Sequence, residues 1–119
     1  MASIVSHIRS LYKNIYLIGN NLSKRDKLGL HTVIEKICIE TLSLSIKASI
    51  ENRAEKWETI RKLRIDIEIL KNLVRTEFEL KTIQEKQYLR IEEALQEISK
   101  EALGWEKYAN KNSPPGESL

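Results

Sequence analysis

The chain has 119 residues, enough for one domain with a buried core but too few for a deep multi-layer enzyme. Four glycines, two prolines and 31% charged residues favour long helices. The net charge is only +3, but it is uneven, because residues 1–25 contain four basic residues and no acid. Cys38 is the only cysteine in the sequence, so no disulfide can form within the chain, and a reducing cytoplasm is the expected setting.

Neither a membrane span nor a secretory signal is expected. No apolar run approaches the roughly 18 residues needed to cross a bilayer. His7, Arg9 and Lys13 interrupt the first apolar positions, which argues against a signal peptide. The acid-free start resembles an organelle transit peptide, but the same residues fit a bundle helix better.

A first helix is expected over about residues 3–21. Its apolar side chains recur at steps of 4 and 3, the spacing of a narrow bundle seam: Ile4, Ile8, Leu11, Ile15, Ile18 and Leu22. Gly19 and the two asparagines after it supply turn residues for its end. Ser23 and Asp26 can then cap a short helical turn.

A second helix, about residues 30–50, is apolar nearly all round and should be covered on two sides. Its buried face is predicted to contain Leu30, Val33, Ile34, Ile37, Thr41, Leu44 and Ala48. A second apolar line, here called the outer line of this helix, consists of Ile39, Leu42, Ile46 and Ile50. These four could belong to a wider core, but a similar line on the next helix favours an interface between subunits.

The third helix, about residues 57–78 and opened by the capping pair Asn52 and Glu55, organises the rest of the chain. Its buried stripe is Ile60, Leu63, Ile67, Leu70, Val74 and Phe78. Its outer line lies roughly opposite and consists of Ile65, Ile69 and Leu73. Between the two runs the basic strip: Arg61, Arg64, Lys71 and Arg75, interrupted only by Glu68.

A last helix is expected to begin at a capping box of Thr82 and Glu85. Its seam is Tyr88, Ile91, Leu95, Ile98, Ala102 and Trp105. From residue 110 the sequence is typical of a disordered tail, so the predicted domain covers residues 1–109 and the tail 110–119. Four helices with short links predict an all-α fold, an antiparallel up-down four-helix bundle. The two outer lines predict that it assembles into a homo-oligomer.

Catalytic and metal-binding chemistry is not indicated. His7 and His31 have no Glu-x-x-His or cysteine partner, so no metal site and no cofactor are predicted. Cys38 is better explained as a packed, inert thiol than as a nucleophile. No glycine-rich phosphate loop is present in the sequence. We therefore expect that the protein is not an enzyme.

The basic strip has two interpretations. Charged helix flanks are usually only solvated, but this strip adjoins a predicted oligomer face, and symmetry would repeat it around a ring. Its cations would then bind phosphate groups, with Lys24 and Arg25 as a second contact. Trp57 lies on the same flank and could stack on a base, although packing is its commoner role.

The stretch SKRDKLGLHTVIEKICIETLSLSIKAS, the basic third helix and the ending around Gly104-Trp105-x-Lys107 resemble one family. They are similar to Avd, the accessory variability determinant of diversity-generating retroelements, over about residues 3–109. Proteins encoded by intervening sequences of ribosomal RNA genes form a related branch. The resemblance implies a ring-like homopentamer with a positive surface. It also implies binding to a reverse transcriptase and its template RNA during mutagenic retrohoming.

Two functions stay open at this point. The first is a non-catalytic, nucleic-acid-binding accessory protein that supports mutagenic cDNA synthesis by the reverse transcriptase. The alternative is a structural oligomer or protein-interaction module of the intervening-sequence type, whose basic strip is only solvated.

Overall fold

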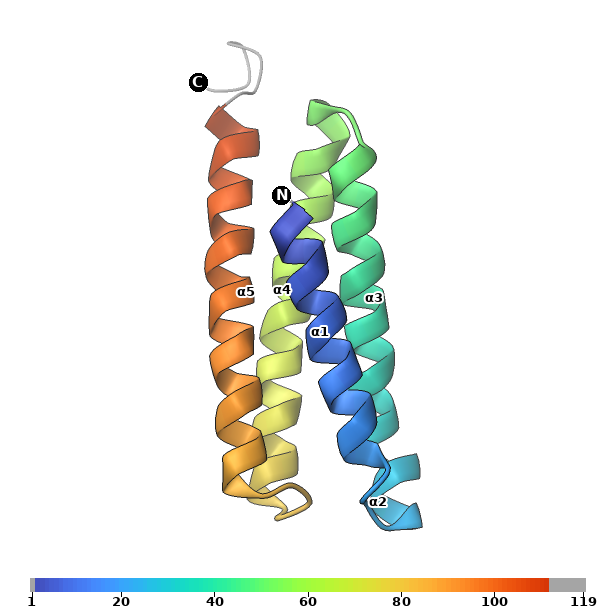
Figure 1. Ribbon diagram of the computed structural model, residues 1–119. Helices are drawn as coiled ribbons and strands as arrows, with labels where there is room; N and C mark the ends of the chain where they lie inside the picture. The colour runs from blue at the N-terminus through green and yellow to red at the C-terminus, as the bar shows by residue number, and fades with distance from the viewer. Residues whose placement is uncertain (1, 112–119) are drawn as a thin grey trace.

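A computed structural model describes the backbone of residues 2–111 and the side chains of residues 4–110. The helices are α1 (Ala2–Gly19), α2 (Lys24–Leu28), α3 (Leu30–Ile50), α4 (Arg53–Glu79) and α5 (Glu85–Lys111). The four long helices pack side by side, and successive ones run in opposite directions (Figure 1). Helix α1 packs against α3 and α5, and α4 packs against the same two helices from the diagonal position. The predicted all-α four-helix bundle is confirmed.

The seams predicted for α1, α4 and α5 form the core. Each contributes side chains that are almost completely buried at predicted positions, whereas the predicted seam residues Leu22, Phe78 and Tyr88 are only half-buried. The buried seam residues are Ile4, Ile8, Leu11, Ile15, Ile18, Ile60, Leu63, Ile67, Leu70, Val74, Ile91, Leu95, Ile98, Ala102 and Trp105. Helix periodicity alone located these residues because polar and charged side chains separate the buried stripe from the rest of each helix.

The buried face of α3 was predicted only in part, since Ile34, Thr41 and Ala48 are buried as predicted and Leu30, Ile37 and Leu44 are half-buried against the core. Val33 is 45% exposed, whereas the residues that enter the core are His31, Ile34, Cys38, Thr41, Ser45 and Ala48. Apolar residues surround α3, so its sequence gives little contrast between faces. The hydroxyls of Thr41 and Ser45 donate to the carbonyls of Ile37 and Leu42 within the helix, at 2.8 and 2.7 Å, so their burial leaves neither hydroxyl unpaired.

The caps of α2 and α4 are as predicted, but the start of α5 is not. Ser23 accepts from the backbone N–H of Asp26, and Asn52 accepts from that of Glu55. Thr82, by contrast, belongs to the end of α4, because its backbone N–H donates to the carbonyl of Glu77 at 3.0 Å.

Lys81 completes this ending of α4. It adopts a left-handed conformation with φ 64°, and its N–H donates to the carbonyl of Phe78. These two bonds are the Schellman pattern that closes many helices. Helix α5 therefore starts only at Glu85, with the side chain of Gln87 accepting from the backbone N–H of Gln84.

A polar cluster crosses the core between three helices. His31 of α3 and Glu77 of α4 are both buried, with Nδ1 and a carboxylate oxygen 2.7 Å apart. Nε2–H of His31 donates to the carbonyl of Ile15 in α1, at 2.8 Å. Sequence reasoning missed this cluster, although both residues continue their seams at steps of 3 and 4.

Helix α5 extends to Lys111, two residues past the predicted domain boundary, and the rest of the predicted tail lies outside the described residues. Among the helices described, none is both long and apolar enough to cross a bilayer.

Candidate nucleic-acid interface

The basic strip forms on the side of α4 that faces α5. The contact that shows this is the hydrogen bond from the guanidinium of Arg64 to a carboxylate oxygen of Glu106 in α5, at 2.5 Å. Lys71 pairs with Glu68 at 3.1 Å, and Arg75 pairs with Glu79 at 3.3 Å. Three of the four cations of the basic strip therefore have carboxylate partners. The sequence had indicated only one acid, Glu68, next to the strip.

The fourth cation, Arg61, has an aromatic partner instead. Its guanidinium carbon lies 4.9 Å from the ring centroid of Trp57, within the range of a cation–π contact. Trp57 is half-buried and packs against the core, so one use of its ring is structural. Arg61 itself is exposed and pairs with no carboxylate in the described part of the chain.

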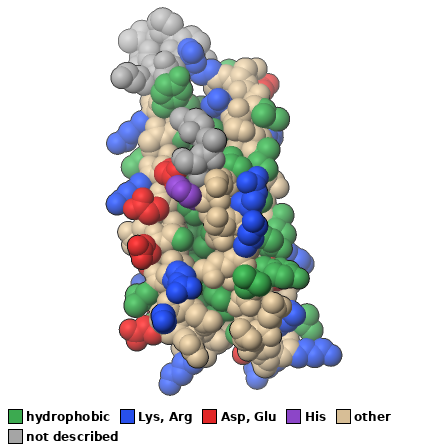
Figure 2. All heavy atoms as spheres, in the orientation of Figure 1, with side chains coloured by type: hydrophobic (Ala, Val, Ile, Leu, Met, Phe, Trp, Pro, Cys, Tyr) green, Lys and Arg blue, Asp and Glu red, His purple; other side chains and the backbone are tan. Residues whose placement is uncertain are grey.

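The structure does not bring Lys24 and Arg25 into the strip. They lie on α2, which packs against α3, whereas the strip lies beside α5. Both are exposed, and neither forms an ion pair within residues 4–110. Figure 2 shows further Lys and Arg side chains along the α1 side of the visible face. Positive charge is thus spread over several helices rather than collected at one place.

The two outer lines lie on different sides of the bundle. Glu35 is 3.6 Å from the point where a Cβ on Gly19 of α1 would lie, and Ile39, Leu42 and Ile46 continue from it at steps of 4, 3 and 4. The outer line of α3, which also contains the exposed Ile50, therefore borders α1.

The outer line of α4 borders the basic strip instead. Ile65, Ile69 and Leu73 line a hollow of about 580 Å³ together with Arg61, Arg64 and Glu106. Ile65 and Ile69 are exposed, as are Ile39 and Ile46, so both lines leave apolar surface uncovered in the single chain.

The surroundings of the histidines and of Cys38 fit a structural role for these side chains. No group of three or more His, Cys, Asp or Glu side chains is placed to hold a metal ion among the described residues. Cys38 is completely buried, and burial raises the pKa of its thiol to about 12. A thiol that stays protonated at neutral pH is a poor nucleophile, which agrees with a packing role.

Comparison with known proteins identifies the family of this four-helix bundle. The model of a family described as bAvd-like matches residues 3–109, nearly the whole of the described chain. The chain belongs to the bAvd-like family. Avd-type proteins are non-catalytic accessory proteins of diversity-generating retroelements, and membership implies such an accessory role here. No curated protein and no solved structure matches this Avd-like chain.

Proposed function

We propose that this Avd-like protein is a homopentameric, RNA-binding accessory subunit in the cytoplasm. In this role it associates with the reverse transcriptase of a diversity-generating retroelement and with its template RNA, and it supports mutagenic cDNA synthesis. The observation that carries the proposal is the family match over residues 3–109 of a chain that forms a four-helix bundle.

The electrostatics of the basic strip are compatible with phosphate binding. Arg75 pairs with Glu79 at the surface, where such pairs contribute at most about 1 kcal/mol, whereas the Arg64–Glu106 pair is partly buried. A phosphate group can therefore replace Glu79 at little cost. Arg61 needs no such exchange. Contacts of this kind position RNA without reading its sequence.

The outer lines are compatible with a ring. A twofold dimer uses one patch twice, whereas a ring joins two different patches of neighbouring subunits. Here the outer line of α3 borders α1, and the outer line of α4 borders the strip and the α5 side. Such a ring would repeat the strip once per subunit and multiply its attraction for RNA.

The test is reconstitution of purified protein with the reverse transcriptase and template RNA of its retroelement. We expect a stable complex whose RNA affinity falls steeply between low and high salt, because cations bound to phosphates are exchanged for counterions. Failure to bind either partner would refute the proposal.

The pairing of three strip cations with carboxylates favours a second candidate. This is a structural oligomer or protein-interaction module of the intervening-sequence type, with a strip that is only solvated. It predicts an oligomer whose RNA binding is negligible at moderate salt.

A further inference from the structure

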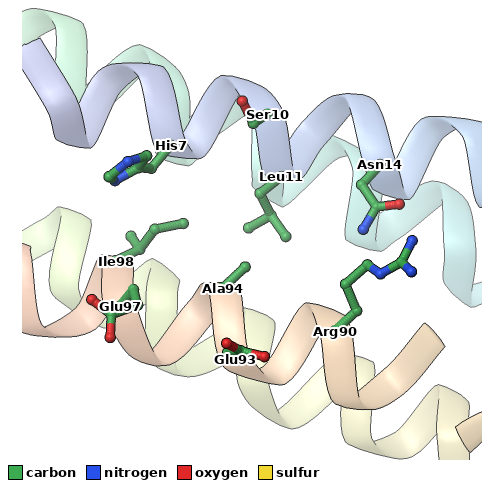
Figure 3. A pocket seen from close by; sticks show the side chains of 9 residues that line it. All are labelled: His7, Ser10, Leu11, Asn14, Arg90, Glu93, Ala94, Glu97 and Ile98. Carbon is green, nitrogen blue, oxygen red and sulfur yellow. The ribbon is translucent and has the colours of Figure 1, made fainter. Parts of the chain in front are cut away.

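The seam between α1 and α5 is hollow on one side of the bundle. A groove of about 460 Å³ runs along it, with Leu11 of α1 and Ala94 and Ile98 of α5 at its floor (Figure 3). Leu11 and Ile98 are almost completely buried, whereas the short side chain of Ala94 is only half-buried and forms the accessible part of the floor. Polar side chains form the edges: His7, Ser10 and Asn14 on α1, and Arg90, Glu93 and Glu97 on α5.

The α5 edge of this groove carries two acids, Glu93 and Glu97, and one base, Arg90, so its net charge is negative, although the protein as a whole is basic. Glu93 forms no ion pair within residues 4–110, and Glu97 lies 3.7 Å from Lys100, with both side chains well exposed. Glu101 follows on the same edge and contacts His7 across the seam at 2.6 Å. Figure 2 shows acidic side chains along the α5 side of this face, with Lys and Arg side chains among them.

Gly104 continues the same edge one turn beyond Glu101. A glycine inside a helix costs about 1 kcal/mol relative to alanine. Nothing in this subunit requires it, since a Cβ built on Gly104 has no neighbour within 4 Å among the described residues. A residue without a side chain on an exposed helix edge permits the close approach of another backbone.

The residues along this edge form one line on the surface of α5, which is a shape that a second helix can follow. Ala94, Glu97, Glu101 and Gly104 follow one another at steps of 3, 4 and 3, which is the spacing with which one helix contacts a second helix lying along it. The groove offers such a helix an apolar floor for side chains on one of its faces. The groove also lies on the α1–α5 side of the bundle, away from the outer lines of α3 and α4.

We propose that the groove between α1 and α5 binds a helix of the reverse transcriptase, one that presents an apolar side chain to Ala94 and Lys or Arg side chains to Glu93 and Glu97. The inference rests on the proposed function, which supplies the partner. An RNA-binding enzyme carries cationic surface, and cations of the partner opposite an acidic edge give the complex its orientation.

Two variants test the groove. Glu93→Lys with Glu97→Lys reverses its acidic edge at exposed positions, and its control, Glu58→Lys with Glu85→Lys, makes the same change of net charge at exposed positions elsewhere. Gly104→Leu fills the space above Gly104, and its control is Gln96→Leu, exposed on another face of α5. Binding to the purified reverse transcriptase is measured after nuclease treatment at fixed salt. Each groove variant should bind about tenfold more weakly than its control.

RNA binding and oligomer size should be unchanged relative to the controls, and the Gly104→Leu chain should unfold at a higher temperature than wild type. If wild type itself does not bind the enzyme, the proposed function fails. If wild type binds and the groove variants bind equally well, only the groove inference fails. A smaller oligomer in the groove variants would overturn it too, because a second copy of the chain would then occupy the groove.

Discussion

His31 and Glu77, 46 residues apart in the sequence, share a 2.7 Å contact between imidazole Nδ1 and carboxylate inside the bundle. Burial alone lowers the pKa of His31, but the hydrogen bond and charge of Glu77, the carbonyl of Ile15 and the charge of Glu35 together raise it above its usual 6.5. Since the carbonyl of Ile15 can only accept, Nε2 carries a proton. The raised pKa indicates that Nδ1 carries one as well, so a charged pair joins α1, α3 and α4.

This pair predicts the pH dependence of stability. Because the pKa of His31 is raised in the folded protein, its stabilisation is complete below about pH 6.5 and is lost as the pH rises through the folded-state value. Glu77→Gln should destabilise the protein by about 3 kcal/mol and flatten this dependence, because His31 loses its buried partner. Thermal unfolding from pH 6 to 9 measures both effects. Equal alkaline loss of stability in the variant and the wild type would contradict the assignment.

Gly19 and Gly104 should respond in opposite ways to alanine. A Cβ on Gly19 would lie 3.1 Å from Cδ2 and 3.2 Å from Nε2 of His31, so the buried ring must shift. We expect Gly19→Ala to destabilise the protein by about 1 kcal/mol. Gly104→Ala meets open space within a helix and should stabilise it by about 0.5–1 kcal/mol. Denaturant titration compares the two, and an increase in stability for Gly19→Ala would refute the close contact.

Lys81 offers a stabilising substitution at the end of α4. A side chain in the left-handed region costs roughly 1–2 kcal/mol, and glycine avoids that cost. Lys81→Gly should therefore raise the free energy of unfolding by about 1 kcal/mol. Lys100→Gly, in the interior of α5, removes the same charge and should lower it by a similar amount. Chemical denaturation of the two variants decides the matter, and a loss of stability in Lys81→Gly would be inconsistent with this helix ending.

The basic strip predicts a change in salt dependence. If Arg64 and Arg75 contact phosphates, Arg64→Ala with Arg75→Ala should weaken RNA binding and reduce the slope of log K against log salt by roughly 1.4, about 0.7 per contact with single strands. Lys86→Ala with Lys100→Ala on α5 is the control and should change little. Glu106→Gln should instead strengthen RNA binding, because it frees Arg64. Filter binding at several salt concentrations tests all three. If the arginine variant has the same slope of log K against log salt as wild type, the basic strip is only solvated and does not bind RNA.

The outer lines predict the behaviour of the oligomer. Ile46→Glu and Ile69→Glu each place an unpaired charge in the proposed interface, which should give a smaller species that is still fully helical. Leu89→Glu is the matched control, since Leu89 is an exposed apolar residue outside both lines. Light scattering with circular dichroism reports size and helicity together. Wild type that is monomeric at micromolar concentration would rule out this assembly.

The sequence was sufficient for features that depend on positions three or four residues apart. The seams of α1, α4 and α5 and the caps at Ser23 and Asn52 are of this kind. Each follows from helix periodicity or from a side chain that reaches a backbone N–H within the next turn. The bounds of α3 were also predicted correctly, but its buried face only in part, because a helix that is apolar all round has no distinct polar face.

Only the tertiary structure decided the relationships between helices. Arg64 binds Glu106 across 42 residues, His31 binds Glu77 across 46, and Glu93 and Glu97 lie on the edge of a groove that α1 and α5 form together. Periodicity gives the angle of a side chain about its own helix axis, but it does not give the rotation of one helix against another. That rotation depends on how all four helices pack at once, and it determines which charges meet, which are paired and which face solvent.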